Sequence, residues 1–179
     1  ENVRGDLNDY TRFDEKVFIP PLPSDESGKV DKGFTILEDG AGNASLDNTE
    51  INKERGVVLE ESRLGKGANE RMRNKYFPEL FNGSAYATRL PIGKDSIIEN
   101  FNASSLSRFY KTWYRPDLMA VIVVGDIDPA AAEKEIMKHF CHFKNPVNET
   151  PRPAIIAVAE RKQNMGMVLT DKEQTINIL

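Results

Sequence analysis

The sequence is poor in the residues that most often bind metals or form cross-links, with one cysteine and two histidines among 179 residues. Because Cys141 is the only cysteine, a disulfide within the chain is excluded. The cysteine content therefore does not indicate whether the protein resides in an oxidising or a reducing compartment. No apolar run approaches the roughly 18 residues that cross a bilayer, so we expect no membrane span. The formal charge of −4 comes from interleaved acidic and basic residues, which excludes the basic face typical of nucleic-acid binding.

The overall amino-acid composition is ordinary for a globular protein. Hydrophobic residues make up 39% of the chain and charged residues 29%. The length favours one domain, or one domain with part of a second. Helical and strand patterns alternate along the chain, which favours an α+β or α/β fold.

The local patterns predict several helices and a few short strands. Helical spacing covers residues 29–38, 48–64, 68–76, 96–100, 103–114 and 130–140. Glycines 40 and 42 are expected to end the first helix, and Pro78 the third. Strand patterns cover residues 6–19 as strand–turn–strand, 118–124 as a buried strand, and 167–169 and 175–179 as two short strands without partners. Residues 144–166 contain three prolines and show neither the helical nor the strand spacing of apolar residues, which predicts that they form a linker.

Two glutamates in the second helix could carry chemistry. Glu54 and Glu61 are seven residues apart, so in an α-helix they project from one face, within about 20° of two full turns. Ile51 and Val58 share that face, which the pattern predicts to be the buried one. Two carboxylates facing a core need a compensating partner, and a metal cation is one solution.

The alternative is that both glutamates pair with arginines on or near a solvated face. Arg55, Arg63 and Arg71 lie nearby in the sequence, and helices rich in Glu and Arg are common. Glu60 points elsewhere on the helix and is expected to be solvated. Periodicity alone leaves the two interpretations open.

Four phrases of the sequence resemble one known family in their order and spacing. They read DLNDYTRFDEKVF from residue 6, ERGVVLEESR from residue 54, LFNGSAYATRLPIG from residue 80 and FYKTWYRPDLMAVIVVGDIDP from residue 109. Together they resemble the inverted zincins, the zinc metallopeptidases of the pitrilysin/insulinase family. The resemblance covers residues 5 to about 140, and TDKEQT at residues 170–175 is a weaker echo.

The resemblance implies a zinc-dependent metalloendopeptidase. In that family two histidines of an HxxEH motif and a more distant glutamate bind zinc, and the glutamate within the motif is the catalytic base. Carried over by motif, the third zinc ligand is Glu61, and Glu54 is the acidic residue that supports the site. Asn8 and Tyr10 fall in the edge strand beside the zinc, where a peptide substrate adds as an extra strand. Asp9 and Arg12 replace the small residues usual there, which leaves the side-chain preference of the pocket open.

The sequence departs from this pattern at the histidines. His139 and His142 are the only two, and neither belongs to an HxxEH motif. In the family that motif precedes the DLNDYT segment, so the general base is expected upstream of Glu1. The chain as given is therefore expected to bind zinc weakly or not at all, and to be inactive.

A rival metal site is suggested by HFCHF, which places His139, Cys141 and His142 close together. The phrase ends an amphipathic helix, where histidine is favoured by the helix dipole and a free cysteine is usually a small buried hydrophobe. We therefore favour a structural role for these three residues.

The resemblance also implies a domain organisation. The fold is expected to be α+β, an antiparallel or mixed sheet flanked by helices, as in one domain of that family. Residues 1–143 would form most of the first domain, 144–166 a linker and 167–179 the start of the second. Expected partners are a peptide or protein substrate, an upstream segment, and a second half or a homologous subunit that closes a chamber. The alternative function is a non-catalytic homologue that serves as a scaffold or binding subunit.

Overall fold

A computed structural model describes residues 8–23, 28–154 and 157–178. The chain divides into two compact units, each made from two stretches of sequence: Glu1–Asp47 with Asn102–Pro151, and Asn48–Phe101 with Arg152–Leu179. Each unit combines helices with a two-stranded antiparallel sheet, which confirms the predicted α+β class. Within the described ranges, no helix combines the length and the apolar character that spanning a bilayer requires.

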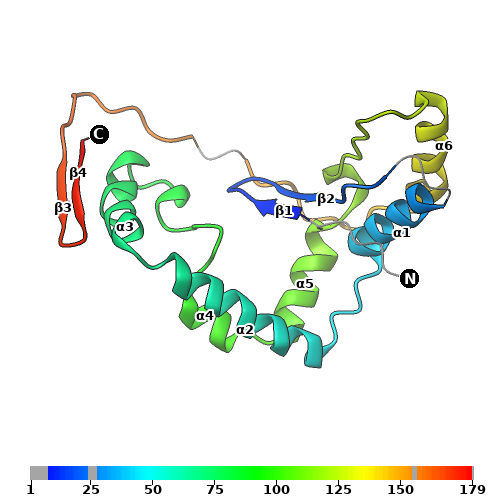
Figure 1. Ribbon diagram of the computed structural model, residues 1–179, viewed down its shortest axis with the longest axis horizontal. Coiled ribbons are helices and arrows are strands. Elements are labelled where there is room, and N and C mark those ends of the chain that lie inside the picture. The colour runs from blue at the N-terminus through cyan, green and yellow to red at the C-terminus, as the bar shows by residue number, and fades with distance from the viewer. Residues whose placement is uncertain (1–7, 24–27, 155–156, 179) are drawn as a thin grey trace. The chain divides into compact units, whose positions relative to one another are not determined.

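The first unit opens with the predicted β-hairpin. Strands β1 (Asn8–Thr11) and β2 (Lys16–Ile19) run antiparallel, with Asn8 opposite Ile19 (Figure 1). The backbone N–H of Arg12 donates to the carbonyl of Glu15 at 2.8 Å, which closes the turn. Aromatic and β-branched residues supply the strands and charged residues supply the turn, so the local sequence is sufficient to specify this hairpin.

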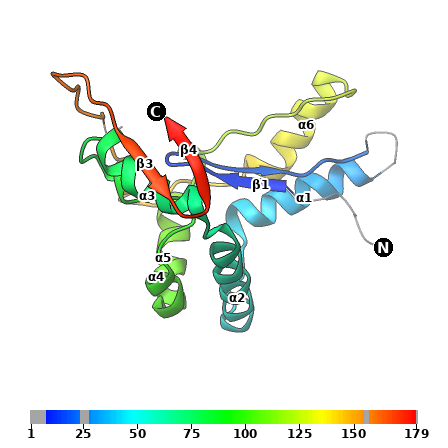
Figure 2. The same ribbon diagram turned by 60° about the vertical axis from the view of Figure 1, so that its left-hand side comes forward.

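The core of the first unit lies between two helices. α1 (Lys29–Gly42) packs beside α6 (Pro129–Phe140), as Figure 1 and Figure 2 both show. Phe34 is buried and stacks on the imidazole ring of His139, with ring centroids 5.8 Å apart. α1 continues through Gly40 and Gly42, so the expected end near residue 38 is wrong. Two glycines reduce helix propensity but do not forbid a helix when packing favours it.

Pro129 begins α6 as the sequence predicted, because its fixed φ suits a first helical position. The helix α5 (Ala103–Trp113) agrees with the predicted 103–114, and the 3₁₀ turn η2 (Pro116–Leu118) follows it.

The predicted buried strand at 118–124 is wrong. Residues 119–124 form neither helix nor strand, and the side chains of Ile122 and Val124 are 82% and 91% exposed. A strand exists only through hydrogen bonds to a neighbouring strand, and none of the described strands pairs with this segment. The apolar pattern indicates that this segment tends to form a strand, but it does not supply the neighbouring strand with which the segment would have to pair.

The second unit is built around two helices in sequence, α2 (Asn48–Gly65) and α3 (Ala68–Leu80), followed by the 3₁₀ turn η1 (Ala85–Ala87) and α4 (Asp95–Asn100). Arg55 joins α2 to α4, because its guanidinium donates to the carbonyls of Ile98 and Phe101 and lies 4.2 Å from the Phe101 ring centroid. Pro78 lies inside α3, so the prediction that it ends the helix is wrong. A proline in the last turn removes a single backbone bond, and the N–H of Phe81 still donates to Phe77 at 2.9 Å.

The second unit also contains a hairpin formed by β3 (Val168–Asp171) and β4 (Gln174–Ile178). The strands lie antiparallel in Figure 1 and Figure 2. The sequence predicted both strands but described them as lacking partners, whereas each is the other's partner.

Candidate functional site

The glutamates of α2 are exposed, although the helical pattern placed them on the buried stripe. Ile51 at the start of that stripe is buried and Val58 is partly buried, whereas Glu54 and Glu61 both reach solvent. The predicted burial of the two carboxylates is therefore wrong for the described structure. Helical spacing fixes the direction of a side chain, but burial also requires another element to lie over it.

The nearby arginines bind other groups, so the alternative in which they pair with Glu54 and Glu61 is not formed. Arg55 binds the carbonyls at the end of α4, Arg71 binds Asp171, and Arg63 donates two hydrogen bonds to Glu60 at 2.6 and 2.7 Å. Within the ranges that the structure covers, neither Glu54 nor Glu61 makes a hydrogen bond or ion pair. Two acidic side chains on one face of α2 thus stay open to a cation from outside the chain.

Glu60 differs from its neighbour in this respect. The Arg63 guanidinium beside it lowers the pKa of the Glu60 carboxyl below its ordinary value. Glu60 is therefore an ion-paired surface residue, and it offers a control one position away from Glu61.

The proposed substrate residues lie on β1 in the first unit. Asn8 is exposed, and Tyr10 is 38% exposed with the Arg12 guanidinium 4.9 Å from its ring centroid. Asp9 pairs with Lys16 across the hairpin. β2 pairs with one edge of β1, and no strand of the described chain pairs with the other edge.

The residues of HFCHF do not converge on one point. Cys141 is exposed with its Sγ 3.1 Å from the Met137 Sδ, and the His142 Nε2 lies 3.5 Å from a Glu38 oxygen. His139 instead turns toward α1, where its Nδ1 lies 2.6 Å from Glu38 and its Nε2 3.1 Å from Asp31. This placement contradicts a metal site built from the two histidines and the cysteine.

The cluster that does form around His139 was missed by sequence reasoning. The ligand atoms of Asp31, Glu135 and His139 lie within 4.8 Å of one another. The ammonium of Lys138 contacts both carboxylates, at 3.2 Å in the case of Glu135, so cations of the chain itself balance this cluster. The available signal was the four-residue spacing of Glu135 and His139, but their partner on α1 is more than 100 residues away.

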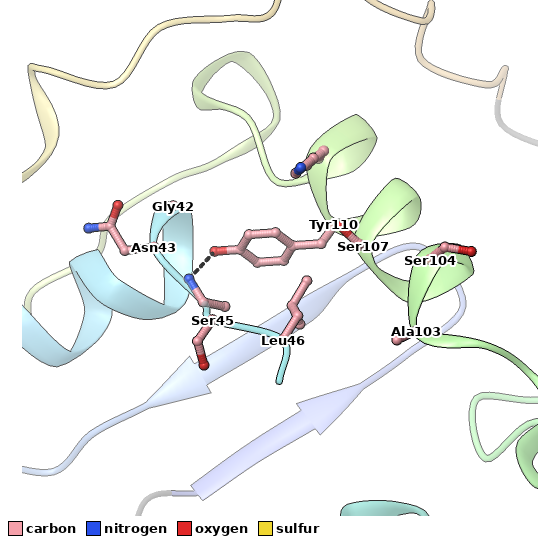
Figure 3. Close-up of a pocket in the computed structure, with 10 residues that line it drawn as sticks. Gly42, Asn43, Ser45, Leu46, Ala103, Ser104, Ser107 and Tyr110 are labelled. Atoms are coloured by element: carbon pink, nitrogen blue, oxygen red, sulfur yellow. Dashed lines mark hydrogen bonds between the residues drawn. The ribbon is translucent and has the colours of Figure 1, made fainter. Parts of the chain in front are cut away.

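A cavity of about 480 Å³ lies in the first unit, between one side of α5 and the segment 42–46 at the end of α1 (Figure 3). Figure 3 shows the Tyr110 ring projecting from α5 across it, where the hydroxyl donates to the Gly40 carbonyl at 2.8 Å and accepts from the Ala44 N–H at 3.3 Å. Partial burial raises the pKa of the Tyr110 hydroxyl. The other polar lining groups are an amide, three serines and Lys111, which provide hydrogen bonds but no paired acid and base: Asn43, Ser45, Ser104, Ser107 and Lys111.

Comparison with known sequences finds similarity to proteins named as zinc proteases. The family profile described as "Peptidase M16 inactive domain" matches residues 100–178, a range that excludes Glu54 and Glu61. The chain is 35% identical over 145 residues to the probable zinc protease PqqL of Haemophilus influenzae, covering 81% of this chain and 16% of that protein. It is 29% identical over 172 residues to the probable zinc protease PqqL of Escherichia coli, covering 96% of this chain and 18% of that protein. The chain spans less than a fifth of the length of these relatives.

Solved structures of proteases also resemble this chain in fold. The first half of the periplasmic protease PqqL from Escherichia coli matches with a TM-score of 0.80 and 28% identity, over 89% of this chain and 34% of that one. A mutant of the ferredoxin protease FusC in complex with Arabidopsis ferredoxin matches with a TM-score of 0.75 and 31% identity, over 82% of this chain and 16% of that one. The profile, the relatives and the structures agree with the four sequence phrases, and the chain therefore belongs to the peptidase M16 family, the pitrilysin/insulinase group.

Proposed function

We propose that this chain is part of a zinc-dependent metalloendopeptidase in which Glu61 is one zinc ligand, and that the chain alone is inactive. The relatives, named as zinc proteases, support the general assignment. The observation that supports Glu61 and Glu54 is that they share one exposed face of α2 and have no partner among the described residues. Glu60 and the three nearby arginines are already paired.

The residues present fit part of a zinc site. A catalytic zinc takes three protein ligands and keeps one position open, and Glu61 offers one anionic oxygen of the required kind. Neither histidine of this sequence belongs to an HxxEH motif, so the other two ligands must come from outside these residues. When bound, zinc lowers the pKa of a coordinated water toward neutrality and polarises the scissile carbonyl. Glu54 would accept a hydrogen bond that orients a zinc-binding group.

The proposed substrate is a peptide that adds as a strand beside β1 within a closed chamber. Main-chain groups on an unpaired strand edge provide affinity, and side chains provide selectivity. The edge of β1 away from β2 carries no described strand, which supports this role. Asn8 would bind the peptide backbone and Tyr10 would line a side-chain pocket. The division into 1–143, 144–166 and 167–179 belongs to this same proposal, as do the upstream segment and the second half or homologous subunit.

The glutamates are to be tested in a longer protein that includes the HxxEH segment expected upstream of Glu1. Glu61→Gln replaces an anionic donor with a neutral amide, so zinc content and peptidase activity should fall together. Glu54→Gln should retain most of the zinc but lose about 10–100-fold in zinc affinity or activity, as changes to groups that orient ligands do. Elemental analysis and peptide hydrolysis are the two measurements.

Glu60→Gln is the matched control. It lies one residue from Glu61 but about 100° around the helix, and it should behave like the wild type. If Glu60→Gln is as damaging as Glu61→Gln, the assignment of the zinc ligand is wrong.

The second candidate function is a non-catalytic homologue that acts as a scaffold or binding subunit. The observation in its favour is that the matching profile is described as an inactive domain. The coding sequence upstream of Glu1 separates the two functions, because an HxxEH motif there indicates an enzyme and its absence indicates a scaffold. The open face of α2 favours the enzyme, since a scaffold has no need for two unpaired acidic groups there.

The isolated chain of 179 residues should hold zinc only weakly, because one or two carboxylates do not complete a tetrahedral set. The measurement is elemental analysis after dialysis against a mild chelator. One zinc ion per chain after that treatment would contradict the expectation.

A further inference from the structure

The buried imidazole of His139 joins two helices that are far apart in the sequence. Its side chain is 7% exposed and stacks on Phe34 of α1. The Nδ1 lies 2.6 Å from a Glu38 oxygen, and the Nε2 lies 3.1 Å from an Asp31 oxygen. A neutral imidazole has one N–H to donate, whereas imidazolium has two, so only the protonated ring satisfies both carboxylates.

We propose that protonated His139 is a pH-sensitive clasp between α1 and α6, and that the clasp is released when the ring loses its proton. This contact would be a conformational switch within the first unit, and it is separate from the proposed zinc chemistry on α2. In the neutral ring one nitrogen presents a lone pair to a carboxylate. That one contact between the helices then changes from attraction to repulsion, while the other ring nitrogen can still donate and Lys138 still pairs with Asp31.

The charges around the ring explain why the proton is held. Asp31 and Glu38 face it from α1, and Glu135 and Lys138 face it from α6, with the Glu135 oxygen 3.6 Å from the Nε2. Lys138 pairs with Asp31 and Glu135, whereas Glu38 faces the rings of His139 and His142. Glu38 is therefore the main cause of the raised pKa of His139, and burial opposes it.

The direction of the pH dependence follows from this. Because the pKa of His139 is raised above its ordinary 6.5, the clasp contributes fully below that pH and is lost as the pH rises through the folded-state value. A metal ion at the same cluster would compete with the proton and with the Lys138 ammonium. The test therefore includes a metal arm.

The experiment uses the ring-proton NMR signals of the full chain, which has only two histidines. Between about pH 5 and pH 9, with EDTA present, the His139 signal should titrate above the peptide value of about 6.5. Glu38→Gln should move that titration down, and His142→Gln should assign the signals and leave the His139 titration in place. The protection of α6 amides, taken as their exchange rate relative to the base-catalysed rate of an unfolded peptide at the same pH, should fall over the same pH interval.

Three results would overturn the clasp. One is a His139 titration at or below the peptide value, and another is α6 protection that does not change while the ring titrates. The third is a His139 ring that stays deprotonated when micromolar zinc replaces EDTA, which would assign the cluster to a metal. Each of these results leaves the proposed role of Glu61 untouched, because Glu61 lies in the other unit.

Discussion

Arg71 attaches the β3–β4 hairpin to α3 through a two-pronged contact. Its guanidinium donates to both oxygens of Asp171, at 2.8 and 2.7 Å, and to Glu173 at 2.7 Å. Only 8% of the Asp171 side chain is exposed. The guanidinium holds the pKa of Asp171 well below its ordinary value of 3.8, and the two carboxylates raise the pKa of Arg71. A planar fork that matches a carboxylate is a contact that lysine does not reproduce.

We expect the hairpin to detach in acid. Because the pKa of Asp171 is depressed in the folded chain, its contribution is present above about pH 4 and is lost as the pH falls through 3.8 toward the folded-state value. Arg71→Ala should remove this dependence and leave the hairpin detached at every pH, and Arg71→Lys should restore only part of the attachment. Hydrogen exchange of β3 amides measures both effects.

The control for this prediction is Lys172→Ala, whose side chain is 83% exposed within the same hairpin. It should leave the acid transition in place. Wild-type protection of β3 in the Arg71→Ala variant would show that the ion pair does not hold the hairpin.

At the scale of elements, α6 depends on a single capping side chain. The Asp128 carboxylate accepts the backbone N–H of Ala131 at 3.0 Å, as the Asn102 side chain accepts that of Ser105 at the start of α5. Capping satisfies an N–H that has no partner inside the helix, and the negative charge also suits the helix N-terminus.

We therefore expect Asp128→Ala to lower the free energy of unfolding by about 1 kcal/mol, within a usual range of about 0.5–2. Urea denaturation followed by far-UV circular dichroism is the measurement. Asp126→Ala, two residues earlier and exposed, is the control and should have little effect. Equal losses in the two variants would mean that charge, and not capping, matters at this helix end.

For the molecule as a whole, the exposed apolar segment 119–124 predicts association. Ile122 and Val124 are 82% and 91% exposed in a segment without strand partners, which is typical of a surface that another chain covers. We expect the isolated chain to be marginally stable or to self-associate. Ile122→Lys together with Val124→Lys should reduce association measured by analytical ultracentrifugation.

Val147→Lys tests whether the effect is specific, because Val147 is also 91% exposed but lies outside the segment. It should leave association unchanged. A monomer that unfolds cooperatively above about 65 °C, the upper end for mesophilic domains, would contradict this prediction.

The sequence by itself determined the elements whose cause is local. The β1–β2 hairpin, the helices α2 and α5 and the start of α6 at Pro129 follow from propensity, periodicity and proline, which act over a few residues. The family also followed from the sequence, because four phrases indicated the family that the relatives and structures then supported. The zinc roles of Glu54 and Glu61 rest on the same phrases and stay predictions.

Only the tertiary structure decided what depends on distant partners. It left Glu54 and Glu61 exposed, left residues 119–124 without a sheet, and directed His139 to Asp31 and Glu38. The arginine partners were also decided there, since Arg71 binds Asp171, which lies one hundred positions further along the chain. A pattern gives the direction in which a side chain points, but burial, strand pairing and ion pairing each need a second group that local sequence does not place.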